Sequence, residues 1–240
     1  MNKENYRAHI LNQVAERLGV AFDNIDLLDQ ALTHASVACE IPGPVADYES
    51  LEFLGDAVLS LSIAHYLYSH APGRGPGEYS KMRASVISRT CLARIAKNLA
   101  LDEAIRLGKG EEQSGGRNRT ALMEDCMEAV IGALYLDKGW PETQQFIERA
   151  FADELKRALT SADAWDYKSR LQHRCQSLHG ELPEFVLIRS EGPDHRKEFE
   201  IEVRIQGRPM GRGIGTSKKK AEQGAAREAL QMNALRVHHK

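Results

Sequence analysis

Carboxylate side chains recur at helical spacing in two distant stretches of this sequence. In residues 47–69, the carboxylates of Glu49, Glu52 and Asp56 stand at positions i, i+3 and i+7, so a helix would place all three on one face within two turns. Like charges placed this close repel one another, and a bound cation would relieve the repulsion. Because hard cations prefer oxygen ligands, Mg²⁺ is the natural candidate.

A second acidic pair lies in residues 120–136, where Asp125 and Glu128 are three residues apart. Apolar residues surround both pairs, so each helix should be largely buried. An acidic helix face is more often simply solvated, and this alternative stays open for either stretch alone. Two acidic pairs on two apolar helices instead favour one shared site of four carboxylates, formed by Glu52, Asp56, Asp125 and Glu128.

The composition is that of an ordinary globular protein whose charge is unevenly divided. The 240 residues are 42% hydrophobic and 28% charged, which fits one large or two modest domains. The net charge of -2 conceals a basic C-terminal part, since residues 166–240 contain 15 Lys and Arg against 10 Asp and Glu, whereas residues 1–165 contain 17 against 24. A basic part of this kind offers an electrostatic surface for a polyanion.

Several classes of protein do not fit the sequence. The four cysteines are scattered without CxxC spacing, so they indicate neither a zinc site nor a disulfide framework. No apolar run approaches the ~18 residues of a membrane span, and the N-terminal stretch lacks the continuous apolar core of a signal peptide. We therefore expect a cytoplasmic protein with no membrane partner.

The first acidic stretch also carries a family resemblance. Residues 49–59, ESLEFLGDAVL, resemble the signature of ribonuclease III, a family of endonucleases that cut double-stranded RNA. Residues 107–116, LGKGEEQSGG, the second acidic helix and the C-terminal region extend the resemblance in order over nearly the whole chain. The match is to the bacterial form, which has one endonuclease domain and one RNA-binding domain. It implies an endoribonuclease, a phosphodiester hydrolase.

The resemblance and the residue patterns together predict two domains. Residues 4–159 would form a mainly α-helical endonuclease domain, and residues 160–165 a short polar linker. Residues 166–235 would form an α+β domain of order α-β-β-β-α that resembles the double-stranded-RNA-binding domain. Within it, residues 197–206 alternate apolar and charged side chains, so one face of that strand should be buried and the other solvated.

Periodicity predicts further elements of the first domain. Helices are expected over residues 4–18, 81–97 and 142–159, and the second acidic helix should end before Gly139. The cations of residues 81–97 have the right sign to neutralise the acidic pairs or to contact phosphates. His34 is a candidate catalytic base, but a lone histidine beside a helix end is more often structural.

The resemblance implies roles for the acidic side chains. It implies an enzyme that depends on Mg²⁺, for which Mn²⁺ can substitute, with one or two ions held by Glu52, Asp56, Asp125 and Glu128. Asp56 and Glu128 are the predicted catalytic residues, and the loss of Glu128 should stop the chemistry. Glu49 is expected to have a structural or interface role.

The resemblance also implies a product and an assembly. The family works as a homodimer with two sites, each of which cuts one strand and leaves a 5′-phosphate and a short 3′ overhang. Precursor ribosomal RNA, structured mRNA and tRNA precursors are the implied substrates. The chain departs from the family at Pro76, where many relatives have a glutamate two residues before the counterpart of Glu78. A metal or dimer role of that glutamate is therefore not assigned to this chain.

The C-terminal domain begins its last predicted helix with three lysines, Lys218, Lys219 and Lys220. Positive charge in a first turn opposes the helix dipole. A phosphate ligand would compensate, because lysines and free backbone N–H groups there converge on one anion. A solvated lysine run is the alternative.

Five residues are assigned to duplex RNA by their position in the resemblance. Ser169 and Gln172, on the first helix, would contact one minor groove. His195, in a loop, would enter the next minor groove. Lys218 and Lys219 would hold the phosphates between the two grooves. A-form RNA is recognised mainly by shape over about 16 base pairs, so little sequence preference is expected.

Two other functions remain open for the sequence alone. A non-catalytic regulator that binds double-stranded RNA would use the C-terminal domain, but it leaves the acidic pairs unexplained. A helical metal phosphohydrolase acting on small nucleotides would not need that domain, so deletion of residues 160–240 would leave its activity unchanged.

Overall fold

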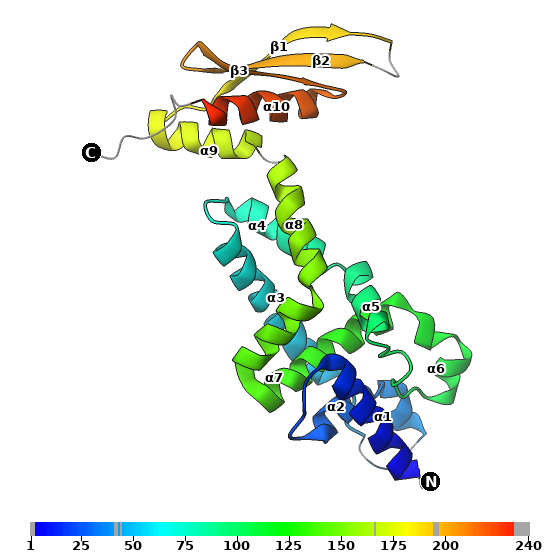
Figure 1. The fold of residues 1–240 in the computed structure, drawn as a ribbon. Helices are drawn as coiled ribbons and strands as arrows, with labels where there is room; N and C mark the ends of the chain where they lie inside the picture. The colour runs from blue at the N-terminus through cyan, green and yellow to red at the C-terminus, as the bar shows by residue number, and fades with distance from the viewer. Residues whose placement is uncertain (1–2, 41–42, 44, 166, 194–196, 233–240) are drawn as a thin grey trace. The chain divides into compact units, whose positions relative to one another are not determined.

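The computed structural model describes residues 3–40, 43, 45–165, 167–193 and 197–232 (Figure 1). Contacts between these residues divide the chain into two compact units. The first comprises residues 1–72 and 79–159, and the second comprises residues 73–78 and 160–240.

Helices form nearly all of the first unit. In chain order they are α1 (Lys3–Leu18), α2 (Ile25–Ala31), η1 (Ala35–Cys39), α3 (Glu49–His70), α4 (Pro76–Val86), α5 (Arg89–Asn98), α6 (Lys109–Gln113), η2 (Gly116–Asn118), α7 (Thr120–Ala150) and α8 (Ala152–Trp165). Residues 76–78 of α4 and 160–165 of α8 fall in the second unit. None of the helices in the described ranges combines the length and apolar character needed to cross a membrane.

Helix α7 forms the centre of this unit, and helices α2, α3 and α5 pack against it (Figure 1). From Ala129 to Leu134 every residue of α7 is buried. A helix that is apolar on all sides must be enclosed by other elements. The sequence encodes this position directly, because the stretch AVIGAL contains no polar side chain.

Three predicted elements differ from the structure. Residues 81–97, predicted as one helix, belong to α4 and α5, which are separated at Ile87 and Ser88. Residues 142–159 are likewise divided, at Phe151, between the end of α7 and α8. The stretch 160–165, predicted as a linker, continues helix α8 to Trp165.

The predicted end of the acidic helix before Gly139 agrees with the backbone. Gly139 interrupts α7 with φ 75° and ψ -172°, a left-handed conformation that glycine adopts without steric cost. Pro141 follows, at the start of the second helical segment. Proline is well tolerated there because its missing N–H lies in the first turn.

The second unit has the predicted order α-β-β-β-α. Helix α9 (Tyr167–His179) precedes strands β1 (Glu184–Glu191), β2 (Glu198–Ile205) and β3 (Arg208–Gly215), and helix α10 (Lys218–Gln231) follows. The strands form one antiparallel sheet in the order β1-β2-β3, and both helices cover the same face (Figure 1).

Small residues hold α10 close to this sheet. The buried alanines of α10 face Ile201, Val203 and Ile205 of β2. A Cβ atom at Gly213 would lie 2.1 Å from the carbonyl oxygen of Ala221, so any larger residue would push the helix away from the sheet.

The opposite face of the sheet departs from the simple alternation expected from the sequence. Glu202 points to the face predicted to be solvated, yet it is only 3% exposed. Its carboxylate accepts hydrogen bonds from Arg204 at 3.0 Å and Arg212 at 3.0 Å. Two long cationic side chains therefore cover and neutralise it, which sequence periodicity does not reveal.

Candidate active site and RNA-binding surface

Two glycines bring α3 and α7 into backbone contact. A Cβ atom at Gly55 would lie 1.8 Å from the carbonyl oxygen of Glu128, and one at Gly132 would lie 2.2 Å from that of Leu51. No side chain fits at either position, so the helices cross with glycine against glycine. Glu52 and Asp56 flank the crossing on α3, and Glu128 lies one turn before it on α7.

The four predicted carboxylates interact across this crossing. Burial raises the pKa of Glu128 to about 8, and the negative charge of Asp56 is the largest further cause. The charges of Glu52 and Asp125 raise the same pKa. Burial also raises the pKa of Glu52, followed by the charge of Asp125. The structure thus brings the two sequence-distant acidic pairs together, and like charges 72 or more residues apart in the chain destabilise one another.

One arginine partly compensates this negative charge. Arg89, at the start of α5, forms an ion pair with Glu124, with Nε 2.5 Å from Oε2. Burial raises the pKa of Asp125 most, the charge of the preceding Glu124 raises it further, and Arg89 lowers it. Arg89 belongs to residues 81–97, whose cations had the right sign to neutralise the acidic pairs, but neither Arg89 nor Glu124 was singled out from the sequence. The acidic neighbour of Asp125 was visible in the sequence, but its pairing with the basic segment required the fold.

The four side chains of the cluster are of the ligand type that a hard divalent cation prefers. All four are carboxylates, and burial together with mutual repulsion keeps the pKa of Glu52, Asp125 and Glu128 above the usual range. Oxygen ligands with uncompensated negative charge are those that Mg²⁺ prefers. In the part of the chain that the structure describes, no three His, Cys, Asp or Glu side chains converge enough to enclose an ion. A bound ion would therefore require the carboxylates to draw together.

Tyr48 contacts this cluster and was not singled out from the sequence. It is 5% exposed, and its hydroxyl donates a hydrogen bond to Oδ2 of Asp125 at 3.4 Å. Burial raises the pKa of Tyr48, and the charge of Asp125 raises it further. A hydrogen bond between residues 77 positions apart leaves no local sequence signal.

His34 has the structural role that the sequence favoured. Its Nδ1 accepts a hydrogen bond from the backbone N–H of Ser36 at 3.1 Å and so caps η1. Its ring packs edge-on against Tyr48 with 5.5 Å between centroids. Glu49 is exposed in the first turn of α3, and its charge raises the pKa of Glu52.

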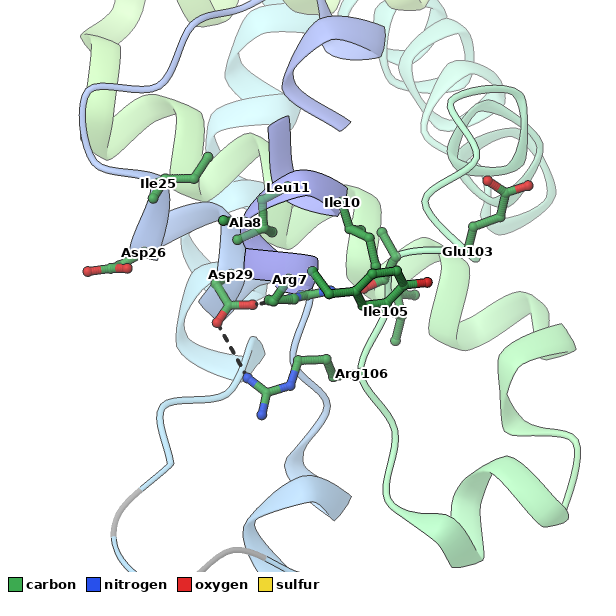
Figure 2. A pocket seen from close by; sticks show the side chains of 12 residues that line it. Arg7, Ala8, Ile10, Leu11, Ile25, Asp26, Asp29, Glu103, Ile105 and Arg106 are labelled. Carbon is green, nitrogen blue, oxygen red and sulfur yellow. Dashed lines mark hydrogen bonds and ion pairs between the residues drawn. The ribbon is translucent and has the colours of Figure 1, made fainter. Parts of the chain in front are cut away.

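A separate pocket of about 730 Å³ lies beside α1 and α2, and none of the four carboxylates of the cluster lines it (Figure 2). Arg7 donates from Nε to Asp29 at 2.6 Å and from Nη1 to the carbonyl oxygen of Ala104 at 2.5 Å. Arg106 reaches the other oxygen of Asp29 at 3.4 Å (Figure 2). These bonds tie α1, α2 and the segment before α6 together.

The predicted RNA-binding residues that the structure describes lie on α9 and α10. Ser169 and Gln172 are half-buried on α9, whereas Lys218 and Lys219 are exposed in the first turn of α10. Ser217 caps α10 by accepting a hydrogen bond from the backbone N–H of Lys220 at 3.3 Å. His195 lies outside the described residues.

The chain matches two family models and a set of known proteins. Residues 24–155 match the model described as Ribonuclease-III-like, and residues 167–233 match the double-stranded RNA binding motif. Ribonuclease 3 of Syntrophotalea carbinolica is 41% identical over 217 residues, covering 90% of this chain and 94% of the relative. Ribonuclease 3 of Clostridium perfringens is 42% identical over 222 residues, covering 92% and 93%.

A solved structure agrees with the first unit. The nuclease domain of ribonuclease III from Campylobacter jejuni has a TM-score of 0.55 and 32% identity to this chain. The match covers 59% of this chain and 96% of that domain. Together with the family models and the relatives, it shows that the chain belongs to the ribonuclease III family and is an endoribonuclease.

Proposed function

We propose that the protein is a Mg²⁺-dependent endonuclease that cuts double-stranded RNA, with Mn²⁺ as an effective substitute. The observation that carries the proposal is the carboxylate cluster at the crossing of α3 and α7. Its negative charge is partly buried and only partly compensated by Arg89. A stable fold does not require such an arrangement, whereas hydrolysis of a polyanion at a metal site does.

In this proposal the metal ligands are Glu52, Asp56, Asp125 and Glu128, and Asp56 and Glu128 are the catalytic residues. A bound ion would supply a hydroxide from water at neutral pH and stabilise charge on the leaving 3′ oxygen. Glu128 must lose its proton to act as a ligand, so its raised pKa couples ion uptake to proton release. Glu49, in the first turn of α3, keeps the proposed structural or interface role.

The RNA duplex would be held mainly by the second unit. Lys218 and Lys219 place positive charge at the N-terminus of α10, where backbone N–H groups also point outward. Ser169 and Gln172 on α9, together with His195, complete the proposed surface. Because duplex RNA is read through its shape, 2′-hydroxyls and phosphates, we expect structured precursors of ribosomal RNA, mRNA and tRNA to be substrates. The proposed products carry 5′-phosphates and short 3′ overhangs, and the proposed compartment is the cytoplasm.

A homodimer is the assembly that the surface of α3 favours. Phe53, Leu61 and Tyr68 are 82%, 58% and 72% exposed, and their spacing of eight and seven residues places them on one side of the helix. Large apolar side chains gathered on one helix face indicate a protein interface. The Campylobacter structure is described as showing flexibility in a region involved in dimer formation of its nuclease domain. Dimerisation through α3 would give one assembly two clusters, one for each strand.

The decisive experiment compares the wild type with Glu128→Gln on a long RNA duplex and on single-stranded RNA, with Mg²⁺ and with EDTA. We expect the wild type to cut only the duplex and only with Mg²⁺. Glu128→Gln should bind the duplex normally but lose at least about a hundredfold in cleavage rate, because one ligand and its charge are missing.

The control is Glu142→Gln, which removes an exposed carboxylate from the same helix, α7. It should cut as fast as the wild type. Undiminished cleavage by Glu128→Gln would contradict the proposed site, and cleavage of duplex RNA in EDTA would contradict the metal requirement.

A further inference from the structure

Tyr48 joins the start of α3 to the acidic cluster. Its backbone N–H donates to the carbonyl oxygen of Thr33 at 3.0 Å, and its own carbonyl oxygen accepts the first hydrogen bond of α3, from Glu52 at 2.8 Å. Its side chain is buried, and the hydroxyl ends at Oδ2 of Asp125. One residue therefore contacts both helices that carry the carboxylates.

The phenol ring of Tyr48 packs against His34, and hydrogen bonds to a neighbouring segment hold His34 in place. The N–H of His34 donates to the carbonyl oxygen of Arg106 at 3.0 Å, and Arg106 is in turn anchored by Asp29 (Figure 2). The hydroxyl of Ser36 lies 2.8 Å from Nδ1 of His34 and accepts from the N–H of Gly108 at 2.8 Å. These bonds fix the His34 ring, which packs edge-on against Tyr48.

The surroundings of Asp125 leave few groups to orient it. Its neighbour Glu124 forms an ion pair with Arg89, and the charges of Glu124, Glu52 and Glu128 repel the Asp125 carboxylate. Among the side chains that the structure describes, only the Tyr48 hydroxyl donates a hydrogen bond to the Asp125 carboxylate. A carboxylate has about four lone-pair positions, so one donor on Oδ2 leaves Oδ1 free to bind an ion.

We propose that Tyr48 is a positioning residue for metal binding: its hydroxyl holds the Asp125 carboxylate in the orientation in which it binds the divalent ion. This inference rests on the proposed metal-dependent function. Groups that hydrogen-bond to a metal ligand fix its orientation, and their loss commonly weakens metal affinity about 10–100-fold. At 3.4 Å the hydrogen bond is long for O–H···O, so the lower end of that range is expected here.

The test removes only the hydroxyl. Tyr48→Phe keeps the ring that packs on His34, and the matched control is Tyr79→Phe, which deletes the hydroxyl that donates to the carbonyl oxygen of Ala71 at 2.8 Å. Mn²⁺ binding to the RNA-free protein is measured by calorimetry. The kcat and KM for a duplex RNA are then measured over a range of Mg²⁺ concentrations.

We expect Tyr48→Phe to raise the Kd for Mn²⁺ about tenfold and to lower kcat at limiting Mg²⁺. High Mg²⁺ should restore kcat, and KM for RNA should stay unchanged, because the second unit holds the duplex. Tyr79→Phe should match the wild type in all three quantities. If Tyr48→Phe lowers the metal-free melting temperature, calorimetry well below that temperature still compares folded proteins.

Two kinds of failure are distinguishable. If the wild type binds and cuts but Tyr48→Phe has the Mn²⁺ affinity of Tyr79→Phe, the positioning role is wrong and the proposed function stands. If the wild type itself neither binds Mn²⁺ nor cuts duplex RNA, the proposed function is wrong and the inference falls with it.

Discussion

Gly132 allows the carboxylates of α3 and α7 to meet. Gly132→Ala would place a methyl group 2.2 Å from the carbonyl oxygen of Leu51, and backbone cannot yield as a flexible side chain does. We expect the free energy of unfolding to fall by about 1–3 kcal/mol, as for an overpacked core, and Mn²⁺ affinity to fall with it. Denaturant unfolding and calorimetry measure the two quantities.

The control for this substitution is Gly110→Ala in α6. A Cβ atom there has no neighbour within 4 Å, and alanine favours the helix. Gly110→Ala should lower neither quantity. If Gly132→Ala behaved like Gly110→Ala, the close crossing would not be what assembles the cluster.

Glu128 should make the stability of the metal-free protein depend on pH. Its pKa is about 8 in the folded state, chiefly because it is buried, against about 4.3 in an unfolded chain. Between these values the folded state binds the proton and the unfolded state does not, so stability falls as pH rises through the window. Glu128→Gln removes the ionisation and should therefore stabilise the protein at the upper end of the window.

The expected gain in the free energy of unfolding is on the order of 1–2 kcal/mol near pH 8 and close to zero near pH 4, and solvent screening keeps it below the full shift. Urea unfolding in EDTA at both pH values measures it. A gain of equal size at both would show that packing, rather than ionisation, causes the effect.

The sequence could predict which site residues share a helix face, because that follows from local spacing. It could not predict contacts between residues that lie far apart in the chain. The spacing of Glu52 and Asp56, and of Asp125 and Glu128, follows from helix geometry, so their shared faces could be read from the sequence. Tyr48 and Asp125 are 77 residues apart, and their contact depends on how α3 and α7 cross. The same holds for Arg89 and Glu124, which are 35 residues apart.

At the scale of elements, helix type was predicted more reliably than helix ends. Residues 81–97 have an almost unbroken helical pattern, yet the chain turns at Ser88, whose extended backbone precedes α5. Serine is common at that position because it can satisfy free N–H groups, but it is also tolerated within helices. Residues 160–165 contain neither Gly nor Pro, so nothing in them ends α8.

The exposed face of α3 should control assembly. Phe53→Glu places a charge on a side chain that is 82% exposed, so folding should be unaffected while a dimer interface would be disrupted. Light scattering should show a dimer for the wild type and a monomer for Phe53→Glu, with a loss of duplex cleavage. The control is Leu182→Glu, which is 64% exposed in the second unit. A dimeric Phe53→Glu would place the interface elsewhere.

At the scale of the whole molecule, the division of charge could be read from the sequence because each part has its own composition and periodicity. Residues 166–240 are basic and include a stretch that alternates as a strand, whereas the earlier residues are acidic and helical. Two units of opposite charge should perform separable tasks on a polyanion: one binds it, and the other, despite its negative charge, acts on it through a cation.

This division predicts that substitutions in the second unit change KM, whereas substitutions in the acidic cluster of the first unit change kcat. The double substitution Lys218→Gln and Lys219→Gln removes two exposed cations at the start of α10. It should raise KM for duplex RNA and reduce the salt dependence of log K by about 2, or about 1 for each lost phosphate contact. It should leave kcat unchanged, whereas Glu128→Gln should lower kcat and leave RNA affinity and its salt dependence unchanged.

Binding titrations at several salt concentrations and cleavage at saturating RNA measure these quantities. Arg208→Gln, at an exposed position of β3 in the same unit, controls for net charge and should have a much smaller effect on the salt dependence. An equal effect would mean that the overall positive charge of the second unit, rather than the N-terminus of α10, holds the RNA. A large fall in kcat for the lysine variant would mean that α10 also positions the RNA for the acidic cluster.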